Sequence, residues 1–107
     1  MRIAEIGRAA GLDLVVGAQV GESGILSAAG RHLASALGSP RYVEGSGGSL
    51  LLREDLTSER VLPGRRGVAR SFTAAGLGVH VKEDVLDRLR VGAQTLTETS
   101  VAKVPSR

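Results

Sequence analysis

The chain of 107 residues contains no cysteine and no tryptophan, and its only aromatic residues are Tyr42 and Phe72. The absence of cysteine excludes disulfides and thiolate metal sites. With aromatic residues at 2% and hydrophobic residues at 42% of the sequence, a core must be built from Leu, Val, Ile and Ala. No apolar run reaches the roughly 18 residues of a membrane span, and the N-terminal stretch lacks the apolar segment of a signal peptide. We therefore expect a single soluble, cytoplasmic domain at most, with no membrane partner.

Lysine is scarce as well, since only Lys82 and Lys103 accompany the arginines in a chain of net charge +3. The arginines are scattered, and their only local cluster is Arg65, Arg66 and Arg70. A nucleic-acid surface concentrates basic charge on one face, and single-strand sites add aromatic stacking platforms. We interpret the charge as a solvated basic surface and expect no nucleic-acid partner. Binding through the three-arginine cluster is the least favoured alternative.

The pattern of residues 12–44 predicts a strand, a helix and a second strand. The continuous apolar run Leu12–Ala18 is typical of a strand covered on both faces. A helix is expected to begin after Ser23, whose hydroxyl would accept a backbone N–H bond of the first turn. It is expected to run to Leu37 on apolar positions three and four apart, before Gly38. The strand Arg41–Glu44 follows, and a right-handed crossover makes the two strands parallel.

Elements outside this unit are less regular. Residues 2–10 carry the apolar spacing of the last turns of a helix, which Gly11 would end. Residues 76–81 predict a short strand entered by a tight turn, and residues 82–90 predict a short helix. The polar stretch 91–107 is expected to form an extended tail.

Two carboxylates follow the two predicted strands, Glu22 and Glu44. Neighbouring parallel strands end at the same edge, so these side chains should converge as they do at the mouth of an α/β barrel. Each acid could instead serve structure alone, Glu22 as a charge at the helix N-terminus. Gln19 and Ser23 flank this edge and could hydrogen-bond a substrate, although a structural role is the more common one for such polar residues. His80 has no carboxylate or second histidine at metal-ligand spacing, so we assign it no chemistry and expect no metal site.

The stretches VVGAQVGESGILSAAGRHLASAL, RYVEG and AAGLGVHV resemble the C-terminal part of enolase-superfamily enzymes, in particular the mandelate racemase and muconate lactonizing enzyme group. The resemblance covers about residues 2–90. It implies an α/β fold in which residues 1–45 are the last strand–helix–strand unit of a (β/α)7β TIM-like barrel. Residues 46–90 would then be the C-terminal strands and helix of the capping domain, and residues 91–107 the extended tail.

The resemblance also implies a reaction. Family enzymes are Mg²⁺-dependent racemases, epimerases, cycloisomerases or dehydratases that remove the proton α to a substrate carboxylate, and the complete enzyme would be a homo-oligomer. Glu22 matches the acid that closes the seventh strand. Glu44 matches the eighth-strand acid that hydrogen-bonds the substrate carboxylate as it becomes an enediolate. The metal-binding acids and the Lys-x-Lys base belong to earlier strands that this chain lacks.

We therefore expect a fragment of such an enzyme that is inactive alone. The alternative is a stand-alone interaction module, because a two-stranded sheet exposes unpaired backbone groups at its edges.

Overall fold

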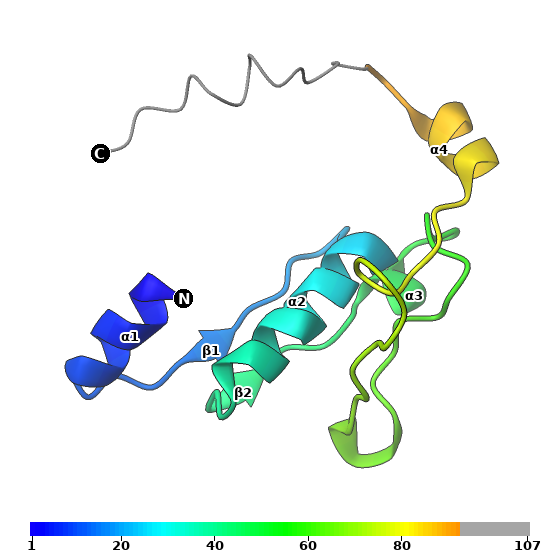
Figure 1. Cartoon of the computed structure of the whole chain (residues 1–107). Coiled ribbons are helices and arrows are strands. Elements are labelled where there is room, and N and C mark those ends of the chain that lie inside the picture. The colour runs from blue at the N-terminus through cyan, green and yellow to red at the C-terminus, as the bar shows by residue number, and fades with distance from the viewer. Residues whose placement is uncertain (93–107) are drawn as a thin grey trace.

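The computed structural model describes residues 1–92, which form a small α/β arrangement around two parallel strands (Figure 1). β1 and β2 pair with Val15 opposite Tyr42 and Val16 opposite Val43, which confirms the predicted parallel crossover. The elements in chain order are α1 (Arg2–Ala9), β1 (Val15–Val16), α2 (Gly24–Leu37), β2 (Tyr42–Val43), α3 (Gly48–Leu51), the 3-10 turn η1 (Arg65–Gly67) and α4 (Glu83–Leu89).

A small apolar core joins α1, β1 and α2. Ala4, Val16 and Leu37 are buried together, and Leu14 and Ala34 pack against them. In α1 the predicted apolar face is wrong, because the buried residue is Ala4, whereas Ile3 and Ile6, which carry the apolar spacing, are 86% and 61% exposed. Gly11 follows α1 with a φ of 71°, a conformation that favours glycine, so the chain can reverse there and lead into β1. This core fixes the direction in which β1 runs toward the N-terminus of α2.

Both strands are shorter and more exposed than the sequence predicted. The expected strands at 12–18 and 41–44 reduce to two residues each. Val15 is 53% exposed, so the prediction of a strand covered on both faces is wrong for this residue of β1, and Val43 of β2 is 51% exposed as well. The physical reason is that residues 1–92 supply no further strand beside β1 or β2. The sheet therefore keeps apolar side chains and unpaired edges in contact with solvent.

Residues 46–92 contain little regular structure. The strand predicted over residues 76–81 is wrong, because only a single antiparallel bridge forms, between Thr57 and Val81. Gly76 and Gly78 have φ values of 64° and 71°, which bend the chain before it can pair along its length. The predicted helix over 82–90 is confirmed as α4, with Val85 buried. The expected tail of residues 91–107 lies, from residue 93 on, outside the described residues.

Within residues 1–92, no helix is both long and apolar enough to cross a membrane.

Candidate functional site

The two glutamates predicted from the strand ends bind neighbouring backbone amides. The N–H of Ala18 donates to Oε2 of Glu44 over 2.8 Å, and the N–H of Gln19 donates to Oε1 of Glu22 over 2.7 Å. Both amides belong to the segment that leaves β1. The two carboxylates therefore bind the amides of two consecutive residues at the C-terminal end of the sheet. This is the edge at which the parallel pairing of the strands led us to expect them.

The local backbone explains how the chain reaches this arrangement. Gly17 lies beside Glu44, and a Cβ there would sit 3.6 Å from Oε2. Gly21 has a φ of 90°, which reverses the chain between Gln19 and Glu22. The N–H of Glu22 reaches back toward the carbonyl of Gln19 over 3.4 Å. Glu22 is thus folded back over the end of β1 by a tight turn.

Ser23 does not cap α2 through its side chain as predicted. It is the N-cap residue, with φ −77° and ψ 170°, but its hydroxyl makes no capping bond. Instead, the N–H of Gly24 donates to Oδ1 of Asp55 over 2.7 Å. A carboxylate accepts this bond more strongly than a hydroxyl and is also favoured by the positive end of the helix. The sequence prediction therefore had the right position and the wrong acceptor.

A pocket of about 970 Å³ opens beside the glutamates. Its walls come from the C-terminal ends of β1 and β2, one face of α2 and the segment 63–69. Glu22 and Glu44 both line it, and the apolar part of the wall includes Leu26 and Leu33. Gln19 and Ser23 do not line the pocket, although the backbone N–H of Gln19 binds Glu22. The pocket combines a mostly apolar wall with a few convergent polar groups, which is the composition of small-molecule sites.

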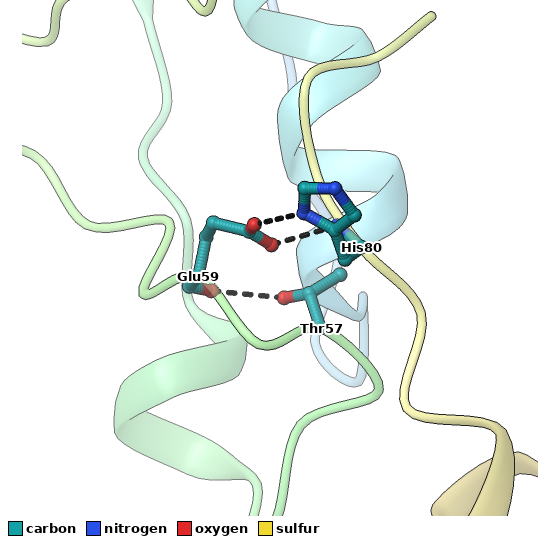
Figure 2. A network of polar contacts seen from close by, with 3 residues as sticks. All are labelled: Thr57, Glu59 and His80. Atoms are coloured by element: carbon teal, nitrogen blue, oxygen red, sulfur yellow. Dashed lines mark hydrogen bonds and ion pairs between the residues drawn. The ribbon is translucent and has the colours of Figure 1, made fainter. Parts of the chain in front are cut away.

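His80 and Glu59 form a second polar pair, which the sequence did not reveal (Figure 2). Neither residue lines the pocket. Nδ1 of His80 is 2.6 Å from Oε1 of Glu59, and the backbone N–H of His80 donates to Oε2 over 2.7 Å. The hydroxyl of Thr57 donates to the carbonyl of Glu59 over 2.9 Å. The hydrogen bond from the His80 side chain, followed by that from its backbone, lowers the pKa of Glu59 to about 2. Since 21 residues separate the partners, no local pattern could have found this pair.

Arg31 and His32 of α2 bind the segment 62–77. Arg31 donates to the carbonyls of Leu62 and Arg70 over 3.1 and 3.2 Å, and its guanidinium lies 4.9 Å from the ring centroid of Phe72. Nε2 of His32 lies 3.1 Å from the carbonyl oxygen of Leu77. Burial lowers the pKa of Arg31. These contacts fasten the segment that forms one wall of the pocket.

The described residues do not fit a magnesium ion. No three of the acidic or histidine side chains in residues 1–92 lie together in a group that could hold a metal. Glu22 and Glu44 bind backbone amides, and Mg²⁺ needs near-ideal octahedral oxygen geometry. The lysine base that the family resemblance implies is not supplied by Lys82 either, because this N-cap residue of α4 does not line the pocket.

The fold and the acidic strand ends define an α/β unit of the kind that barrels place at their C-terminal face. A model of the enolase C-terminal domain-like family matches residues 1–85, and the chain belongs to that family. No curated protein and no solved structure matches the chain. Because the match covers both halves of the described structure, it includes the glutamate pair and the segments that hold it.

Proposed function

We propose that this chain forms the C-terminal strand–helix–strand unit, with part of the capping domain, of an enzyme that removes the proton α to a carboxylate. One observation supports this above all. In a member of the enolase C-terminal domain-like family, Glu22 and Glu44 meet on consecutive amides beside a pocket of about 970 Å³. The whole enzyme would be a racemase, epimerase, cycloisomerase or dehydratase acting on a small carboxylate.

The two acids have separate roles in this proposal. Removal of the α-proton places negative charge on the substrate carboxylate, and a hydrogen-bond donor aimed at that charge lowers the barrier. Glu44, in its protonated form, donates to this oxygen. Glu22, held by the amide of Gln19, orients a donor or contacts the substrate. Gln19 and Ser23 lie outside the pocket lining, so the proposal includes only the two glutamates.

The remaining chemistry must come from outside the described residues. The family resemblance implies a bound Mg²⁺, and residues 1–92 do not supply its ligands. The reaction also requires a general base at the pocket. Lys82, the lysine of the described residues, does not line the pocket and so does not supply this base. We therefore propose that the chain alone is inactive and that further barrel units provide the metal ligands and the base.

The proposal can be tested by ligand titration of the ¹⁵N-labelled chain with small carboxylates that carry an acidic α-proton. We expect saturable shifts at the amides of Ala18 and Gln19, because a ligand that engages Glu44 and Glu22 changes their bonds to these amides.

Matched variants define the role of Glu44. Glu44→Gln keeps a hydrogen-bond donor without a charge and should retain binding. Glu44→Ala should weaken binding about tenfold, the value of one hydrogen bond to a charged group. Glu83→Gln, on exposed α4, is the control. If no carboxylate shifts the two amides, the proposed site is wrong. If the chain alone exchanges α-protons in D₂O with Mg²⁺ present, the proposed inactivity is wrong.

A second candidate function, an interaction module that pairs through its sheet edges, is favoured by the exposure of the strands. Val15, Tyr42 and Val43 are 53%, 64% and 51% exposed. Strand edges that carry apolar side chains can accept another chain. Size-exclusion chromatography separates the candidates: a defined dimer supports the module, whereas aggregation supports a unit made for a larger barrel.

A further inference from the structure

The turn that carries Glu22 is held from behind by a segment that lies beyond β2 in the sequence. Asp55 accepts the first N–H of α2, that of Gly24, over 2.7 Å. Gly24 is buried, and Glu22 stands two residues before it. The bond therefore fixes the point at which the turn enters the helix.

Two close backbone approaches restrict the same turn. A Cβ on Gly48 would overlap the carbonyl oxygen of Glu22 and would lie 3.5 Å from Oδ2 of Asp55. A Cβ on Gly24 would overlap the side chain of Thr57, whose own Cβ is 3.1 Å away. Thr57 is itself buried, at 4% exposure. The turn from Glu22 to Gly24 is thus confined by Gly48 on one side and by Thr57 on the other.

The side chain of Asp55 has one unfavourable feature that capping a helix does not require. Its Oδ2 is buried and has no hydrogen-bond partner among the described residues. An unpartnered buried polar oxygen is unfavourable relative to a satisfied one. Ser23, a preferred N-cap residue at the usual position, leaves its hydroxyl out of the capping bond. The long-range acceptor stands in place of a local one that the sequence already offers.

From these contacts we propose that Asp55 is a positioning residue, which sets the place of the Glu22 carboxylate at the pocket through the N–H of Gly24. The inference rests on the proposed function, in which Glu22 faces the substrate. Asp55 acts on Glu22 through three residues of backbone. It accepts the N–H of Gly24 and so holds the backbone of residues 22–24 in place, which lets Glu22 accept the amide of Gln19 over 2.7 Å. The segment after the barrel unit thereby controls a side chain of the barrel mouth.

The test is amide exchange and amide proton shift in the full ¹⁵N-labelled chain, without ligand. In Asp55→Ala we expect the amides of Gly24 and Gln19 to exchange about tenfold faster together, the change for one lost bond to a charged acceptor. Asp55→Asn retains an acceptor oxygen and should restore both. Asp87→Ala, which removes an exposed acid of α4 paired with Arg90, should change neither.

A merely structural cap would give a different pattern. If Asp55→Ala alters Gly24 and leaves Gln19 unchanged, the positioning role is overturned. Should Asp55→Ala fail to fold, Gly48→Ala decides the question, because it keeps Asp55 and pushes on the carbonyl of Glu22. It should shift Gln19 and leave Val85 of α4 unchanged, and an unchanged Gln19 overturns the inference. Since no ligand is used, failure here is distinct from failure of carboxylate binding.

Discussion

Residues 1–45 and residues 46–92 are organised in different ways. The first region has regular elements around apolar contacts of Ala4, Val16 and Leu37. The second region buries Val61 and Val85 with little regular structure, and long-range polar bonds tie it, such as those of Asp55 to Gly24 and of His80 to Glu59. Apolar periodicity is a local property that a sequence displays, whereas such polar pairs depend on where the chain returns. The comparison explains why the two halves differ so strongly in predictability.

The largest expected effect is at the contact where the two regions meet. Gly24→Ala places a Cβ against buried Thr57 and should destabilise the fold by about 3 kcal/mol through overpacking. Gly30, in the same helix, has open space at its Cβ position. Gly30→Ala should therefore stabilise by about 0.5–1 kcal/mol, the helix preference of alanine over glycine. Urea denaturation of both variants measures the difference, and equal midpoints would contradict the described contact.

The next effect compares valines of the two regions. Val61 in the second region is 1% exposed, whereas Val15 in the first is 53% exposed. Val61→Ala should cost about 2 kcal/mol through two lost methyl groups and a cavity. Val15→Ala should cost less than about 0.5 kcal/mol, as exposed positions do. Thermal and urea unfolding give both values. A larger loss at Val15 would show that a partner covers β1 in solution.

Three of the helices could be predicted because their signals are local, and α1, α2 and α4 begin and end nearly where the sequence predicted. The sequence pattern did not predict the short helix α3, Gly48–Leu51. The crossover rule gave the parallel pairing of β1 and β2. The strand lengths could not be predicted, because extension of a strand depends on neighbours that residues 1–92 do not contain. The strand expected at 76–81 failed because the two glycines take φ values that no periodicity reveals.

In the candidate site, too, some residues could be predicted from local sequence patterns and others could not. Glu22 and Glu44 could be found because acids directly after apolar runs mark strand ends, and the structure places both at the exit of β1. Asp55 could not be found, since 31 residues separate it from Gly24 and Ser23 offered a nearer acceptor. The roles of the two glutamates in catalysis stay a prediction.

The acid sensitivity of the second region gives a smaller effect. The pKa of Glu59 is lowered from 4.5 to about 2 by His80, so the folded state holds this carboxylate ionised more firmly than the unfolded state does. The stabilisation is complete above pH 4.5 and is lost as the pH falls from 4.5 toward 2. Glu59→Gln should flatten the fall in unfolding free energy over this range. Glu83→Gln, exposed on α4, is the control, and an unchanged acid profile in Glu59→Gln would contradict the pair.

The smallest expected effect is that of magnesium on the first region. The carboxylates of Glu22 and Glu44 bind the amides of Ala18 and Gln19, and residues 1–92 contain no group of three metal-binding side chains. Mg²⁺ gives up its water reluctantly and needs several well-placed oxygens, so two occupied carboxylates should bind it no better than exposed acids elsewhere. Calorimetry with MgCl₂ should show no saturable heat in the micromolar range, and the unfolding midpoint should not rise. Stoichiometric micromolar binding would mean that the two glutamates leave their amides to form a metal site, which would reverse their proposed roles.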